Sequence, residues 1–194
     1  MRIVVATSNK GKLSELSSLL SKTEHKLVSQ GELGIDPAQE TGLTFVENAI
    51  QKARWASETA ELAAIADDSG LIVPALGGEP GIISARYAGV PGDAQQNNSK
   101  LLEALKGMED RQAYFYCCMV FIRRFSDPDP KIAFGRWEGE ITTSPRGGRG
   151  FGYDPLFFIP QLDCTAAELP AHKKNIISHR GIAARNLCEQ INSN

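Results

Sequence analysis

The sequence has few cysteines, and their spacing excludes two kinds of protein. Its four cysteines lack the paired C-x-x-C spacing of zinc sites. They are also too sparse to form the framework of a disulfide-rich secreted domain. The simpler interpretation is a cytoplasmic protein with buried, reduced thiols at Cys117, Cys118, Cys164 and Cys188.

The sequence also has no long apolar run and no large excess of positive or negative charge. No stretch approaches the roughly 18 uncharged apolar residues of a membrane-spanning helix, so no membrane partner is expected. The opening apolar run, residues 1–6, is too short for a signal peptide. The net charge of −2 provides no overall attraction to nucleic acid or to an anionic membrane, so neither is expected as a partner. A site for an anion must therefore be built locally.

What the sequence does contain is enough residues for one domain, or for one domain with two lobes around a cleft. Of its 194 residues, 42% are hydrophobic. Apolar periodicity and turn signals predict strands at 2–6, 26–30, 63–66, 71–73, 113–124 and 131–142. They predict helices at 13–22, 44–62, 93–106 and 178–191. Because the last two strands form a hairpin while others alternate with helices, we expect an α/β fold with a mixed sheet.

The loop Thr7-Ser8-Asn9-Lys10-Gly11-Lys12 lies between the first strand and the first helix. Free N–H groups and the positive end of the dipole make a helix N-terminus an anion site. Short polar side chains and two lysines strengthen it, although a plain N-cap with solvated lysines explains the loop equally well. A P-loop does not explain the loop, because Ala6 replaces the first glycine of that motif and Leu13 replaces its magnesium-binding Ser/Thr.

Two adjacent carboxylates, Asp67 and Asp68, follow the apolar run 63–66. Successive side chains of a strand point to opposite faces, so the two carboxylates have different tasks. Carboxylates at the carboxyl end of a strand lie where α/β sheets bind ligands, and Mg2+ uses one or two of them. A turn at the end of the strand is the alternative interpretation of Asp-Asp-Ser-Gly.

Lys52 lies at the edge of an apolar helical face. It is seven positions from Phe45, about 20° around a helix. Its amine either reaches along that face to water or faces the site and neutralises phosphate charge. Glu40, in the loop before this helix, is either a solvated glutamate or a further metal carboxylate.

Two later segments carry groups that recognise ligands. In the glycine-rich stretch 147–155, the glycines let the backbone approach a ligand and Phe151 can stack on a base. One short Arg-Gly stretch is weak support for RNA binding. His179 and Arg180, near the start of the last helix, are donors suited to a base carbonyl, although such a pair is also common at a surface helix start.

Taken together, six motifs resemble the inosine triphosphate pyrophosphatase family, whose bacterial members hydrolyse XTP, dITP and ITP. The motifs are T-S-N-K-G-K, E-T-G-x-T-F-x-E-N-A, I-A-D-D-S-G-L, P-G-I-x-S-A-R-Y, G-F-G-Y-D-P and I-S-H-R-G. They span Thr7 to Gly181 in the family's order. The resemblance implies a twisted mixed sheet with two lobes flanking an active-site cleft, and a homodimer. It also implies Mg2+-dependent hydrolysis of a deaminated purine nucleoside triphosphate to its monophosphate and pyrophosphate.

The same resemblance assigns roles to individual residues. Asp68 is expected to accept a proton and to bind Mg2+ with help from Glu40, while Lys52 and Asp67 match positions important for activity. The loop from Thr7 to Lys12 is expected to hold phosphates. Further substrate contacts are expected at Ser69, Phe151, Gly152, Tyr153, Asp154, Lys174, His179 and Arg180. The chain departs from the family at residues 171–173, which make the surroundings of Lys174 more basic.

Hydrogen bonding accounts for part of the expected base selectivity. Hypoxanthine and xanthine present a 6-oxo acceptor to His179 and Arg180, whereas adenine presents a donor. Guanine also has a 6-oxo group, and nothing in the sequence identifies the contact that rejects it. A pyrophosphatase for modified pyrimidine nucleotides, a non-catalytic RNA-binding module and a P-loop ATPase are the competing interpretations.

Overall fold

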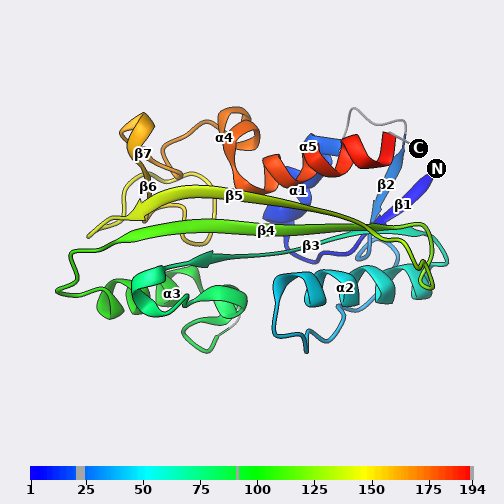
Figure 1. The fold of residues 1–194 in the computed structure, drawn as a ribbon, viewed down its shortest axis with the longest axis horizontal. Coiled ribbons are helices and arrows are strands. Elements are labelled where there is room, and N and C mark those ends of the chain that lie inside the picture. The colour runs from blue at the N-terminus through cyan, green and yellow to red at the C-terminus, as the bar shows by residue number, and fades with distance from the viewer. Residues whose placement is uncertain (21–24, 91, 193–194) are drawn as a thin grey trace. The chain divides into compact units, whose positions relative to one another are not determined.

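The protein is a mixed α/β structure built on a seven-stranded sheet (Figure 1), which confirms the predicted fold class. The computed structural model describes residues 1–20, 25–90 and 92–192. The sheet order is β2-β1-β3-β4-β5-β6-β7. Its strands are β1 (Arg2–Val5), β2 (Lys26–Ser29), β3 (Ala63–Ile72), β4 (Gln112–Ile122), β5 (Lys131–Ile141), β6 (Phe157–Ile159) and β7 (Cys164–Thr165). The α-helices are α1 (Lys10–Leu20), α2 (Phe45–Ala60), α3 (Ala94–Ala104), α4 (Ala171–Ile177) and α5 (His179–Asn192).

The chain folds into two compact units, each assembled from separate stretches of sequence. Unit 1 contains Met1–Asp68, Cys117–Gly135 and His179–Asn194, and unit 2 contains Ser69–Tyr116 and Arg136–Ser178. The strands β3, β4 and β5 each contribute residues to both units. Among the residues described, no helix combines the length and apolar character needed to cross a membrane.

In unit 1, helices cover both faces of the parallel strands. β1 pairs in parallel with β2 and with β3. Because side chains alternate along a strand, one face presents Ile3 and Ile65 to a cluster that includes Leu16 of α1 and Leu187 of α5. The other face has α2, whose alanines are buried (Figure 1). A strand covered on both faces is apolar throughout, as the run before Asp67 is.

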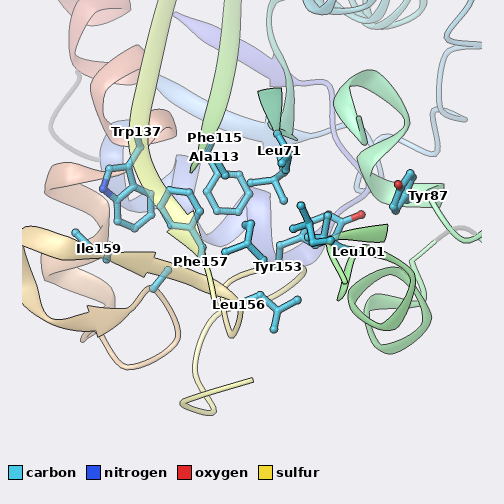
Figure 2. Packing of buried hydrophobic residues seen from close by; sticks show 14 of the residues in the cluster. Leu71, Tyr87, Leu101, Ala113, Phe115, Trp137, Tyr153, Leu156, Phe157 and Ile159 are labelled. Atoms are coloured by element: carbon cyan, nitrogen blue, oxygen red, sulfur yellow. The ribbon is translucent and has the colours of Figure 1, made fainter. Parts of the chain in front are cut away.

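Unit 2 has its own apolar core, centred on three aromatic rings (Figure 2). The rings of Phe115 and Phe157 lie 4.6 Å apart, and those of Trp137 and Phe157 lie 5.0 Å apart. Tyr153 packs into the same cluster, and its hydroxyl donates to the carbonyl of Ser84 over 2.8 Å. Each unit therefore has a separate hydrophobic core.

The loop between β4 and β5 is held by a buried carboxylate. Asp127 Oδ2 accepts hydrogen bonds from the backbone N and the Nε of Arg123, while its Oδ1 accepts from Arg123 Nη2 over 2.7 Å. The backbone N of Asp129 also donates to Oδ1. This loop joins the two long strands that the sequence predicts as a hairpin, and β4 and β5 are neighbours in the sheet.

The structure corrects several predicted boundaries. The runs 63–66 and 71–73, predicted as separate strands, belong to one continuous strand that carries Asp67 and Asp68 in its interior. The interpretation of Asp-Asp-Ser-Gly as a turn is wrong, since these residues belong to β3. Ion pairs on both faces of the strand compensate the charges of Asp67 and Asp68, which break its apolar pattern. Sequence periodicity also missed the short helix α4. The predicted end of the first helix, at 22, lies outside the described residues.

Candidate active site

The centre of the site in unit 1 is the pair of carboxylates in β3. Asp67 pairs with side chains of α1 and α5, and Asp68 contacts side chains of α2. These helices lie on opposite sides of the sheet (Figure 1). The alternation of a strand therefore gives two neighbouring acids two different environments, as the sequence predicts.

Asp67 is fully buried between two cations. Its Oδ2 lies 3.1 Å from Lys12 Nζ and 3.4 Å from Arg180 Nε. Burial raises the pKa of a carboxyl group, but the charges of Lys12, Arg180 and Lys52 outweigh it and hold the pKa of Asp67 well below its ordinary value. Asp67 is thus a permanent anion that fixes two cations.

Arg180 also binds a second acid, which the sequence analysis missed. Its Nη1 donates to Oε2 of Glu15, one turn beyond Lys12 on α1. Although the Arg180 side chain is buried, Asp67 and Glu15 keep its pKa above the ordinary value. The sequence did contain a signal for this contact, because the i, i+3 spacing of Lys12 and Glu15 places both side chains on one face of the helix.

The loop before α1 has the hydrogen bonds of a helix cap. The backbone N of Lys12 donates to Asn9 Oδ1 over 3.1 Å, and the backbone N of Asn9 donates to Thr7 Oγ1 over 3.2 Å. Ser8 and Asn9 are exposed, so the loop is accessible to an anion. Gly11 lies in the first turn of the helix, while the side chain of Lys10 is outside the described part of the structure. The solvated-lysine interpretation is wrong for Lys12, which pairs with Asp67.

On the other face, Asp68 meets two side chains of α2. Lys52 Nζ donates to Asp68 Oδ1 over 2.8 Å, and Asn48 Nδ2 donates to Asp68 Oδ2 over 3.3 Å. Lys52 Nζ also lies 3.0 Å from Glu40 Oε1. Burial raises the pKa of Asp68 despite the nearby lysines. Burial lowers the pKa of an amine, but Asp68, Asp67 and Glu40 together raise the pKa of Lys52.

The start of α2 explains why Lys52 points inward. Thr44 and Glu47 form the predicted capping box, which fixes where the helix begins. Buried alanines bring this face close to the sheet, so the lysine at its edge reaches Asp68 rather than water. Asn48 was missed by the sequence analysis, although its i, i+4 spacing from Lys52 places it on the same face.

Two carboxylates converge on one point beside β3 and suit a hard cation. Asp68 and Glu40 both approach the ammonium group of Lys52, so a positive charge already lies within 3.0 Å of both. In the described part of the chain, no cluster of three or more His, Cys, Asp or Glu side chains is placed to hold a metal alone. Mg2+ fits this donor set, because it takes one or two carboxylates and completes its shell with phosphates and water.

Two thiols of β4 lie beside these acids. Cys117 Sγ is 4.0 Å from Asp67 Oδ2, and both Cys117 and Cys118 are buried. Burial raises the pKa of Cys118 to about 12 and that of Cys117 further. Both therefore remain protonated thiols, whereas Cys164 and Cys188 are only partly buried.

A second group of predicted site residues gathers within unit 2. Lys174 Nζ donates to Asp154 Oδ2 over 2.6 Å, and both side chains are buried. The same oxygen accepts from the backbone N of Phe151, whose ring lies 4.8 Å from Lys174 Nζ. Gly150 has a φ of +74°, and a Cβ there would overlap Asp154. This geometry requires glycine and leaves Asp154 and Lys174 locked together beside an aromatic ring.

The remaining predicted residues have mixed surroundings. The Tyr153 side chain lies in the apolar core of unit 2, so the structure gives its ring a packing role. The carbonyl of Gly152 accepts from Asn98 Nδ2 over 3.1 Å. Ser69 follows Asp68 in β3, at the start of unit 2. His179, the first residue of α5, is buried in unit 1 next to Arg180.

Comparison with known proteins identifies the family. The model of the Ham1 family matches residues 3–190. The chain belongs to the Ham1 family. This result confirms the resemblance seen in the six motifs.

Relatives match along almost the whole chain. A dITP/XTP pyrophosphatase of Photorhabdus laumondii is 53% identical over 192 residues, covering 98% of each chain. One from Halorhodospira halophila is 54% identical over 193 residues, covering 98% of this chain and 97% of its own. Among solved structures, a HAM1 protein from Coxiella burnetii is 45% identical, with a TM-score of 0.93 and full coverage of both chains. The Staphylococcus aureus Ham1 protein is 38% identical, with a TM-score of 0.88 over 100% of this chain and 99% of its own.

Proposed function

We propose that this protein hydrolyses deaminated purine nucleoside triphosphates, namely dITP, ITP and XTP, to the monophosphate and pyrophosphate. The observation that carries the proposal is the division of Asp67 and Asp68 between two sets of cations. One acid is a fixed anion and its neighbour faces a lysine, a glutamate and an amide. Two relatives that are 53% and 54% identical to this chain are named dITP/XTP pyrophosphatases, which supports the same reaction. Its effect is to remove these nucleotides from the nucleotide pool.

The loop from Thr7 to Lys12 binds the phosphates. Its exposed residues, Ser8 and Asn9, and its position at the N-terminus of α1 suit an anion. Lys12 stands at this helix start with its amine on Asp67, so its charge is fixed at the site before substrate arrives. A fixed cation stabilises developing phosphate charge without the cost of reorganisation.

Asp68 accepts the proton of the attacking water, and Lys52 and Asn48 hold its carboxylate in place. Asp68 and Glu40 would hold Mg2+, which would neutralise phosphate charge and stabilise the leaving pyrophosphate. Lys52 keeps these two carboxylates from repelling each other. Water attacks the α-phosphorus, and the bond from that phosphorus to the bridging oxygen breaks to release pyrophosphate.

His179 and Arg180 recognise the base. Phe151, Asp154 and Lys174, which lie together in unit 2, are proposed as further substrate contacts. Donors from His179 and Arg180 match the 6-oxo group of hypoxanthine or xanthine and leave the amino group of adenine without an acceptor. The ring of Phe151 offers a surface for stacking. Gly152, Tyr153 and Ser69 contribute contacts from the adjoining backbone.

We also propose a single pyrophosphatase domain that acts as a cytoplasmic homodimer. The resemblance to the family supports the dimer, and four free cysteines are consistent with a reducing compartment. Light scattering coupled to size exclusion measures the mass directly. A monomer at working concentration would contradict the dimer.

A product assay tests the reaction. The enzyme is incubated with ITP, XTP, dITP and ATP, with Mg2+ and with EDTA in its place. We expect pyrophosphate from the first three and little from ATP, with loss of activity in EDTA. Release of orthophosphate, or equal use of ATP, would overturn the proposal. Including dUTP and a modified dTTP separates it from a pyrimidine enzyme.

A further inference from the structure

The N-terminal turn of α5 lies unusually close to β5. A Cβ built on Gly135 would overlap the carbonyl oxygen of His179 and lie 2.7 Å from the backbone N of Ala183. These two atoms are the ones that the i to i+4 hydrogen bond of a helix joins. The φ of Gly135 is not in the left-handed region. The space, not the backbone conformation, therefore requires glycine here.

Two residues before Gly135, β5 has room for a side chain. Ala133 lies on the same face of β5 as Gly135, and its methyl group is buried in the cluster that includes Ala183 and Leu187. The first turn of α5 thus leaves no room for a side chain at Gly135, whereas the cluster accommodates the methyl group of Ala133. The single missing methyl group at Gly135 allows this approach.

Further along, two side chains of α5 fix the helix to the same strand. Asn186 Nδ2 donates to the carbonyl of Phe134, and Gln190 Nε2 donates to the carbonyl of Ile132, each over 3.0 Å. Four helical residues rise about 6 Å and two strand residues about 6.6 Å, so the two spacings match. The helix is therefore held in one axial position along β5, which Figure 1 shows beside it.

The first turn of α5, which packs against Gly135, carries His179 and Arg180, the two residues proposed to recognise the base. We propose that Gly135, Asn186 and Gln190 are positioning residues that fix His179 and Arg180, and that they set how strictly the enzyme discriminates between bases. The proposal rests on the proposed function. Arg180 leaves this turn to reach Asp67 and Glu15, so a displaced turn also disturbs those contacts.

The test compares two substrates that differ only in the base. The kcat/KM values of dITP and dATP are measured for the unmodified enzyme and for Gly135→Ala. Since a displacement of about 1 Å can cost about 100-fold in rate, we expect the dITP preference to fall at least about tenfold. Partial unfolding lowers both values equally and leaves their ratio unchanged, so the ratio reports positioning. An unchanged ratio would overturn the proposal.

The matched control is Gly31→Ala, in the same unit. A Cβ at Gly31 would lie no closer than 4.0 Å to another atom, at Ser29 Oγ, so the ratio is expected to stay at the starting value. A comparable loss of preference in this control would show that the ratio is not specific to the helix position.

A second variant keeps the test decisive if Gly135→Ala does not fold. Asn186→Ala with Gln190→Ala removes both anchors without opening a core cavity, because Asn186 is exposed and Gln190 is only partly buried. We expect a several-fold loss of dITP preference with the fold retained. An unchanged ratio in this folded variant would contradict the proposal. Failure of the unmodified enzyme to release pyrophosphate from dITP would instead refute the proposed function.

Discussion

Lys52 Nζ lies 2.8 Å from Asp68 Oδ1, on the face of β3 opposite to the one where Lys12 Nζ lies 3.1 Å from Asp67 Oδ2. Two consecutive acids thus each have their own lysine, supplied by different helices. This arrangement separates a carboxylate that holds two buried cations from one that is proposed to take part in the reaction, and each can be tested separately.

Replacing Asp68 by asparagine should nearly abolish turnover and leave the fold intact. Asparagine keeps the size and the contact with Lys52 but accepts protons poorly and binds Mg2+ weakly. Pyrophosphate release and a thermal melt measure the two effects. Asp129→Asn is the control, because that side chain is 67% exposed in a surface ion pair with Lys131. Near-normal turnover in Asp68→Asn would remove Asp68 from its role.

Replacing Lys52 by methionine should lower turnover and also lower the Mg2+ concentration needed for half-maximal activity. The ammonium group occupies the point on which Asp68 and Glu40 converge, so removing it leaves two anions facing each other. Those anions attract a cation more strongly. A Mg2+ titration of activity measures the shift. If the half-saturating concentration rises instead, Lys52 is not a competitor of the metal.

Replacing Asp67 by asparagine should mainly destabilise the protein. The substitution leaves Lys12 and the buried Arg180 without the anion between them, and breaking a buried ion pair costs about 3–5 kcal/mol. Urea unfolding measures the loss. The additional substitution Lys12→Met should restore part of the stability, since it removes one uncompensated cation. A fully stable single variant would show that the pair contributes little.

Asp127 predicts a pH dependence of stability outside the site. The hydrogen bond from Arg123 is the main cause that holds the pKa of Asp127 below its ordinary value. A carboxyl group whose pKa is lowered in the folded state stabilises the fold at pH values above its unfolded pKa of about 4. This stabilisation is lost as the pH falls through the pKa of the folded state. Asp127→Asn should therefore cost about 1 kcal/mol at pH 7. The difference from the unmodified protein should shrink in acid.

Urea titrations at neutral and at acidic pH check this prediction. Asp129→Asn serves again as the comparison, because an exposed ion pair contributes little. A difference in stability that persists at the lowest pH would assign the effect of Asp127 to packing.

Local patterns predicted the parts of the site that depend on local geometry. The alternation of β3 correctly separated Asp67 from Asp68, and the helical angle placed Lys52 at the edge of the apolar face. The capping box correctly gave the start of α2. Each of these predictions needs only the period of one element.

Strand alternation and helical periodicity could not predict contacts between segments that are far apart in the sequence. Arg180 is 113 residues from Asp67, and no periodicity links them. The continuity of β3 was missed because its two charges look like a strand end until their partners are known. The family resemblance predicts that Arg180 contacts the substrate, but the structure was needed to show its two acids.

The discontinuity of unit 1 determines when its buried ion pairs can form during synthesis. Lys12 and Asp67 belong to the stretch Met1–Asp68 of unit 1, whereas Arg180 belongs to the stretch His179–Asn194, which is synthesised later. While that stretch is still inside the ribosome, Asp67 lacks one of its cations and Gly135 faces no helix. The buried ion pairs of Asp67 therefore cannot all form until α5 has been synthesised, and a chain truncated before α5 would leave Asp67 without Arg180.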